Sequence, residues 1–130
     1  MNTNLIKFLL ILKNASLSKK ETLIVEYSTI REQMVRLLYC EGLIQSFTLQ
    51  ANTVSKHDFI KIIFRYSSDK SNLRHLKLLS KPSHIKYIKF SDLCNISDKK
   101  KIVFLSTDYG FLTSSQCKKL KIGGKLLFLC

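Results

Sequence analysis

The spacing of apolar residues changes along the first half of the chain. Between residues 4 and 14, apolar side chains recur every three or four positions, which predicts an amphipathic helix. Residues 22–27 (TLIVEY) are β-branched and aromatic and predict a strand, and a second helix is expected from Thr29, where Glu32 would close a capping box. Gly42 offers the left-handed stop expected past its end. Two strands, over 44–51 and 58–66, complete a predicted α-β-α-β-β unit.

The second half of the chain is predicted to be mostly β. Residues 67–72 (SSDKSN) contain no apolar side chain and indicate a connection between an N-terminal domain, 1–66, and a C-terminal domain, 67–130. Beyond it we expect a short helix over 113–120 and strands near 73–79, 85–90, 102–106 and 125–130. The expected fold class is therefore α+β, with two small domains.

Charge is unevenly distributed between these two halves. The 130 residues carry a net charge of +13, from 22 Lys and Arg and 9 Asp and Glu. Residues 1–66 hold nine bases and five acids, whereas residues 67–130 hold thirteen bases and four acids. A chain this basic suits a polyanionic partner, so nucleic acid is the leading candidate and the C-terminal half its main binding surface. The alternative is that the codon bias of an AT-rich genome raises the lysine content.

The sequence gives little support to other classes of function. Three histidines and sparse acids form no set with catalytic or metal-binding spacing, so we expect no enzymatic activity, cofactor or small-molecule substrate. The apolar run Leu5–Leu12 contains Lys7 and is too short to span a membrane. The cysteines lie far apart without a CxxC pair, and we interpret them as small buried hydrophobic residues in a reducing compartment. They are Cys40, Cys94, Cys117 and Cys130.

Two segments near the end of the chain are candidates for binding a partner, and both are predicted to be turns. In the first, S-T-D-Y-G-F-L-T, the hydroxyls of Ser106 and Thr107 are followed by Gly110 and by Thr113, which would cap the next helix. Such a loop places hydrogen-bond donors and free backbone N–H groups at one edge of a sheet. It could therefore accept phosphate oxygens or ribose 2′-hydroxyls.

The second segment, I-G-G-K, contains the pair Gly123 and Gly124. Two residues without side chains would let the backbone approach a partner closely. The structural alternative is a helix-to-strand turn that requires positive φ.

The motif S-T-x-x-G-x-x-T, followed by G-G and a final hydrophobic strand, resembles the small-subunit ribosomal protein eight family. Other segments agree with this resemblance. They are Lys13-Asn14-Ala15 at the end of the first helix, Cys40 to Ile44 (CEGLI) at the end of the second, and Ser80-Lys81-Pro82 followed by Tyr87. The resemblance runs in order from about Leu5 to Cys130, nearly the whole chain.

The resemblance implies a structural protein that binds a helical junction in the central domain of small-subunit rRNA, mainly through its C-terminal domain and beside neighbouring ribosomal proteins. By matching position, the implied RNA contacts are Ser106, Thr107, Gly110, Gly123, Gly124, Tyr87, Lys13 and Asn14. The competing function is a small basic regulator that binds mRNA or DNA outside the ribosome.

The sequence also departs from the family's pattern. Ser83 stands where a glycine is usual, the adjoining arginine is lost, and Lys125 replaces the glutamate that usually follows the glycine pair. Such sequence divergence, with the order of the family's motifs kept, favours an organellar member of the family. A mitochondrial ribosome is expected, and a plastid ribosome is the alternative.

Tyr87 and the lysine run 99–101 each allow two interpretations. Tyr87 either contacts RNA, by stacking or through its hydroxyl, or is a sheet tyrosine packed on the core. The lysine run 99–101 either meets phosphate or is a solvated loop, with the solvated loop favoured.

Overall fold

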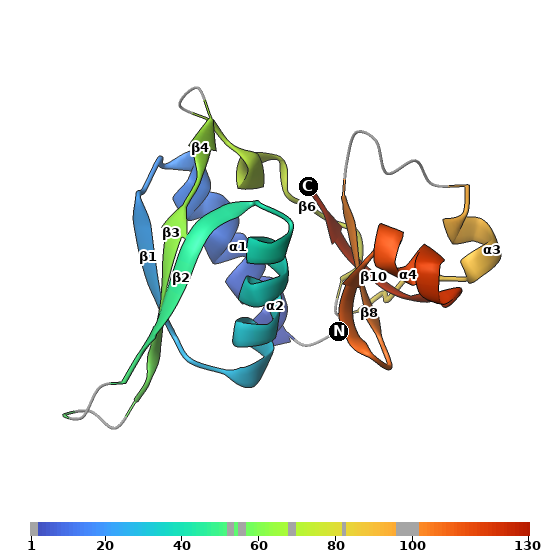
Figure 1. Cartoon of the computed structure of the whole chain (residues 1–130), viewed down its shortest axis with the longest axis horizontal. Coiled ribbons are helices and arrows are strands. Elements are labelled where there is room, and N and C mark those ends of the chain that lie inside the picture. The colour runs from blue at the N-terminus through green and yellow to red at the C-terminus, as the bar shows by residue number, and fades with distance from the viewer. Residues whose placement is uncertain (1–2, 52–53, 55–56, 68–69, 82, 96–101) are drawn as a thin grey trace. The chain divides into compact units, whose positions relative to one another are not determined.

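A computed structural model describes the chain except for residues 1–2, 52–53, 55–56, 68–69, 82 and 96–101. The chain divides into two compact units, Lys7–Arg74 and His75–Cys130, and the described residues 3–6 are grouped with the second. Each unit is an α+β arrangement, which confirms the predicted fold class (Figure 1). Within the described residues, no helix is long and apolar enough to cross a membrane.

The unit Lys7–Arg74 has two helices on one face of a three-stranded antiparallel sheet (Figure 1). Its elements are α1 (Thr3–Leu17), β1 (Thr22–Glu26), α2 (Thr29–Cys40), β2 (Ile44–Gln50) and β3 (Phe59–Phe64). The sheet order is β1-β3-β2, so the predicted α-β-α-β-β unit is confirmed. The core consists of apolar residues from both helices and from the helix-facing side of the sheet, including Phe8, Leu12, Met34, Leu38, Ile60 and Ile62.

α2 begins at Thr29 as predicted, but its cap differs from the prediction. The N-cap is Ser28, whose hydroxyl accepts a hydrogen bond from the N–H of Arg31 at 3.2 Å, and Thr29 is the first helical residue. Glu32 is therefore one position too late to close a capping box, and its carboxylate binds side chains instead. Gly42 has φ +75°, as expected for a residue that stops a helix.

The unit containing His75–Cys130 is a five-stranded sheet with short helices. Its strands are β6 (Lys77–Leu78), β7 (Tyr87–Ile88), β8 (Val103–Thr107), β9 (Gly110–Thr113) and β10 (Gly124–Leu129). The order is β6-β10-β8-β9, and β7 pairs with the end of β10 that β6 leaves free. The helices are α3 (Phe90–Leu93) and α4 (Ser114–Leu120).

One face of this sheet packs on the helices. Leu105 of β8 and Cys117 of α4 are fully buried together with Leu93 of α3, and Leu126 of β10 packs against them. α4 begins as predicted, since Thr113 is its N-cap and forms a capping box with Gln116. The opposite face of the sheet is occupied by Phe104 and Phe128, whose rings stack 4.5 Å apart.

Several predicted boundaries in this region are wrong. Residues 73–79 are not one strand, because Leu73 and Leu76 are both buried at a three-residue spacing, which suits the 3-10 helix Asn72–His75 better than strand alternation. Strand pairing near 85–90 is limited to Tyr87–Ile88, and Phe90 begins α3 instead. The connecting stretch contains the two-residue strands β4 (Tyr66–Ser67) and β5 (Lys70–Ser71). The lysine run 99–101 lies outside the described residues.

Candidate nucleic-acid interface

The segment predicted to be a loop after β8 is a tight hairpin. β8 pairs with β9 as far as Thr107 and Gly110, so that only Asp108 and Tyr109 form the turn. Gly110 adopts φ +102°, a conformation that favours glycine, and no atom lies within 4 Å of the position a Cβ would take. The space around Gly110 is therefore open to a partner.

Four strands place two of the predicted contacts, Ser106 and Tyr87, in one row across the sheet. Lys125 of β10 pairs with Ser106 of β8 on one side and with Tyr87 of β7 on the other. Ser106 in turn pairs with Phe111 of β9. Directly paired residues on antiparallel strands project from the same face. We call Phe111, Ser106, Lys125 and Tyr87 the polar row, and it lies on the face of the sheet opposite to α4.

The adjacent hydroxyls of Ser106 and Thr107 have different surroundings. The Thr107 hydroxyl donates to the carbonyl of Gly110 at 2.9 Å and accepts from the N–H of Tyr109 at 3.2 Å, so it closes the hairpin turn. The half-buried Ser106 hydroxyl has no hydrogen-bond partner among the residues that the structure describes. Because successive residues of a strand face opposite sides, Ser106 is the hydroxyl that the polar row offers to a partner.

The glycine pair lies against the protein's own backbone. A Cβ on Gly123 would come within 2.3 Å of the Ile88 carbonyl oxygen, and a Cβ on Gly124 within 2.7 Å of the Ser106 carbonyl oxygen. Neither glycine has positive φ, and the left-handed residue of this turn is Lys121, at φ 57°. The alternative of a turn that needs positive φ at the glycines is therefore wrong, since close strand packing is what excludes a side chain there.

Ser80 positions the backbone on both sides of the polar row, a role that the sequence motifs do not indicate. Its side chain is buried, its hydroxyl donates to the Leu126 carbonyl, and it accepts from the N–H of Lys86 at 3.1 Å. The Leu126 N–H donates to the Lys86 carbonyl at 2.9 Å. Ser80 thus ties the residue before Tyr87 to the residue after Lys125, and so fixes one end of the polar row.

Tyr87 is not packed on the core, because 68% of it is exposed. The Lys125 ammonium lies over its ring, 5.8 Å from the ring centroid, within the range of a cation–π contact. The packed-tyrosine interpretation is therefore wrong, and Tyr87 is accessible beside a cation.

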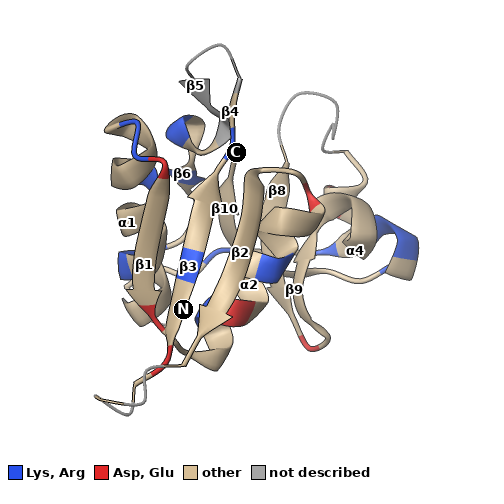
Figure 2. Cartoon of the chain, turned by 60° about the vertical axis from the view of Figure 1, so that its left-hand side comes forward, with Lys and Arg blue, Asp and Glu red and all other residues tan. Residues whose placement is uncertain are grey.

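Exposed basic residues flank β7, and others lie on α4. Lys86 and Lys89 flank β7 and are exposed, and Figure 2 shows further basic residues on α4. Those on α4 are Lys118 and Lys119 in its last turn. The polar row therefore lies in a unit whose charge suits a phosphate backbone.

A model of the ribosomal protein S8 family matches residues 4–130, nearly the whole chain. The chain belongs to the ribosomal protein S8 family. Its function is accordingly that of a structural ribosomal protein and not of an enzyme.

Named S8 relatives are similar to the chain over most of their length. The small ribosomal subunit protein uS8c of Bigelowiella natans is 32% identical, with 98% of both chains covered. The uS8c protein of Helicosporidium is 33% identical over 89% of this chain and 87% of its own. The bacterial uS8 protein of Chlorobaculum parvum is 27% identical over 93% of this chain and 91% of its own.

The remaining predicted contacts, Lys13 and Asn14, belong to the unit Lys7–Arg74 and lie in the last turns of α1. Asn14 is exposed and borders a pocket of about 200 Å³ that also includes Ile11, Lys20 and Leu23. The other six predicted contacts lie close together in the unit of His75–Cys130, whereas Lys13 and Asn14 belong to the other unit.

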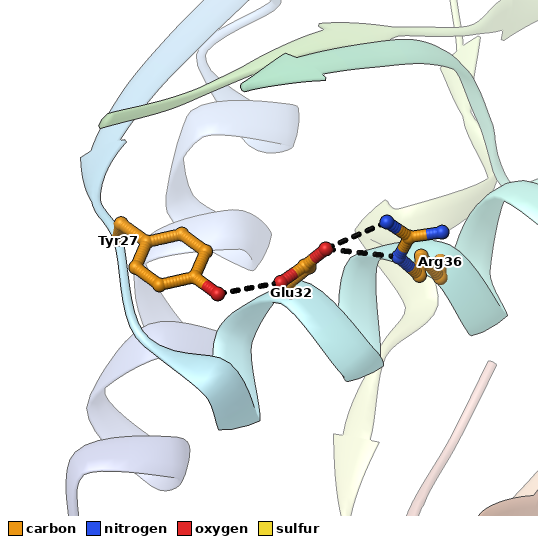
Figure 3. A network of polar contacts seen from close by, with 3 residues as sticks. All are labelled: Tyr27, Glu32 and Arg36. Atoms are coloured by element: carbon orange, nitrogen blue, oxygen red, sulfur yellow. Dashed lines mark hydrogen bonds and ion pairs between the residues drawn. The ribbon is translucent and has the colours of Figure 1, made fainter. Parts of the chain in front are cut away.

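The same unit holds a polar network on α2 (Figure 3). The Tyr27 hydroxyl donates to Glu32 at 2.7 Å, and Arg36 donates to the other carboxylate oxygen at 2.7 and 3.1 Å. The hydrogen bond from Tyr27, together with Arg36, lowers the pKa of Glu32, and the same bond raises the pKa of Tyr27. The network ties the end of β1 to the surface of α2.

The cysteines only partly match the interpretation as buried residues. Cys117 is buried and Cys130 half-buried, and burial raises the pKa of the Cys130 thiol to about 12. Cys40 and Cys94 are exposed, so the interpretation is wrong for these two. Among the described residues, no group of three or more potential metal ligands is present.

Proposed function

We propose that this S8 protein binds the central domain of small-subunit rRNA through the polar row and the hairpin turn beside it, and so supports assembly of the small subunit. The observation that carries the proposal is the register of four strands, which gathers Ser106, Gly110, Gly124 and Tyr87 at one end of a single sheet. Neighbouring small-subunit proteins would cover other surfaces.

The chemistry of this end of the sheet suits folded RNA. A hydroxyl that has no partner among the described residues can bond a ribose 2′-hydroxyl or a phosphate oxygen, and the open side of Gly110 admits a backbone. Lysines supply attraction that does not depend on sequence. We assign the main contact to the C-terminal half, 67–130, and a second contact to Lys13 and Asn14 of the N-terminal half, 1–66.

The two adjacent hydroxyls give a matched test of this site in the full chain. Ser106→Ala should lower the affinity for the central-domain junction by about 2- to 10-fold, as expected for one lost hydrogen bond, and leave stability unchanged. Thr107→Val should instead lower the urea midpoint, because it breaks the turn. An unchanged ability of Ser106→Ala to discriminate the junction from a plain duplex would refute the site.

Sedimentation separates a ribosomal role from the competing one. The protein should remain with small subunits in high salt, whereas a basic regulator of mRNA or DNA would be released as its phosphate contacts are screened. Release at moderate salt from otherwise intact subunits would favour the regulator.

We propose that the ribosome concerned is organellar. The plastid uS8c relatives support this proposal, and the bacterial relatives leave a bacterial ribosome as the alternative. The mitochondrial assignment has no counterpart among these relatives and remains a prediction from sequence drift alone. Fractionation of mitochondria, plastids and cytosol, followed by detection of the protein on small subunits, would decide among them.

A further inference from the structure

We propose that Lys125 is an RNA phosphate-binding residue whose ammonium group is held in place by the Tyr87 ring, and that the two act as one unit. The proposal deepens the proposed function, on which it rests, by assigning a role to a residue outside the predicted contacts. It also assigns Tyr87 a positioning role in place of base stacking on the ring face that Lys125 covers.

The first support is the position of Lys125 in the sheet. It is the central member of the polar row, with Ser106 directly across on β8 and Tyr87 directly across on β7. Direct neighbours of this kind have Cβ atoms about 5 Å apart. A single nucleotide could therefore place its ribose hydroxyl at Ser106 and its phosphate at Lys125.

The second support is that the cation is oriented but not neutralised. Its Nζ lies 5.8 Å from the Tyr87 centroid, and no carboxylate of the described residues forms an ion pair with it. A tyrosine ring attracts an ammonium group through its quadrupole without removing the positive charge. The ring thus restricts a flexible side chain, while the ammonium keeps its N–H donors for a phosphate.

The third support is the anchoring of the backbone on both sides of the pair. Ser80 joins Lys86 to Leu126, which are the chain neighbours of Tyr87 and Lys125. Close packing of Gly124 on Ser106 fixes β10 against β8. A rigid backbone of this kind lowers the entropy that the pair loses on binding RNA.

A double-mutant cycle in the full chain tests the coupling, with affinity for the junction RNA measured over a salt series. Lys125→Met should weaken binding by about three- to tenfold and lower the salt slope by about 0.7–0.9, as expected for one lost phosphate contact. Tyr87→Leu should weaken binding by a similar factor, because the ammonium loses its platform. The double variant should bind no more weakly than Lys125→Met alone.

Two conservative variants and one control complete the experiment. Tyr87→Phe keeps the ring and Lys125→Arg keeps the charge, so both should bind within about twofold of the unaltered chain. The control, Lys119→Met, removes an exposed cation from α4, on the other face of the sheet, and should not interact energetically with Tyr87→Leu.

The outcomes that overturn the proposal are distinct. Full affinity in Lys125→Met, or additive losses in the cycle, would exclude a coupled phosphate contact. An equal loss in Tyr87→Phe and Tyr87→Leu would show that the tyrosine hydroxyl, and not the ring, binds RNA. If the unaltered chain binds the junction and a plain duplex equally, the proposed function fails, and this inference fails with it.

Discussion

Gly124→Ala is the substitution for which the structure gives the sharpest expectation. The added Cβ would lie 2.7 Å from the carbonyl oxygen of Ser106 and 2.9 Å from Cγ2 of Thr107. The first contact is with backbone, so it cannot be relieved by a rotamer change. β10 and β8 must therefore separate by several tenths of an ångström beside the Lys125–Ser106 pair.

The size of the effect follows from that overlap. Overpacking of a closely packed position typically costs about 1–3 kcal/mol. For a chain of this size, such a loss corresponds to a shift of about 1 M in the urea midpoint. Adding Thr107→Ser removes Cγ2 but leaves the carbonyl contact, so the double variant should recover part of the loss and not all of it.

Urea unfolding followed by far-UV circular dichroism, together with RNA binding, provides the measurement. Gly110→Ala is the control. Its loss of stability comes from the backbone φ of +102°, and the added Cβ meets no neighbour, so Thr107→Ser should not recover any of that loss. An unchanged midpoint in Gly124→Ala would refute the packing argument. If RNA binding were nevertheless lost, the glycine would be needed for approach of the RNA.

Three further predictions concern other parts of the chain. Ser80→Ala removes the hydroxyl that bonds the Lys86 N–H and the Leu126 carbonyl, so it should lower stability by about 1–3 kcal/mol in urea unfolding and weaken discrimination of the junction. A thiol reagent at pH 8 should modify exposed Cys40 and Cys94 in the folded protein, whereas Cys117 and Cys130 should react only after unfolding, as mass spectrometry would reveal. Because the pKa of Glu32 is lowered in the folded protein, its ionised carboxylate stabilises the fold at pH values above the ordinary pKa of 4.5. This stabilisation is lost as the pH falls through the lowered pKa. Tyr27→Phe should therefore reduce the urea midpoint at neutral pH, and the difference from the unaltered chain should vanish in acid; a constant difference would contradict this origin.

The regular elements could be predicted because their signals are local. The apolar spacing in α1 and α2, the run TLIVEY and the Thr113 cap each depend on a few consecutive residues. β7 and β6 could not be delimited, because two-residue strands exist only through pairing with β10. The Ser28 cap was missed because Thr29 and Glu32 offered an equally good pattern one residue later.

The candidate residues could be named from the sequence, whereas their surroundings in the fold could not. Motif resemblance identified Ser106 and Thr107 together, yet only strand alternation and the turn geometry separate an available hydroxyl from one that closes a hairpin. The function of Gly124 depends on register with a strand seventeen or more residues away in sequence. Lys125 appeared only as a departure from the family, because its partner Tyr87 lies on another strand.

The order of strands along the chain also constrains how the protein folds during synthesis. β10, the last strand, forms the middle of its sheet and pairs with β6, β7 and β8. Those three strands therefore cannot complete their pairing until residues as far as Leu129 have left the ribosome that makes them. The unit Lys7–Arg74 is continuous in sequence and can fold earlier. The surface proposed to bind rRNA would thus form only after β10 has been made, later than the unit Lys7–Arg74.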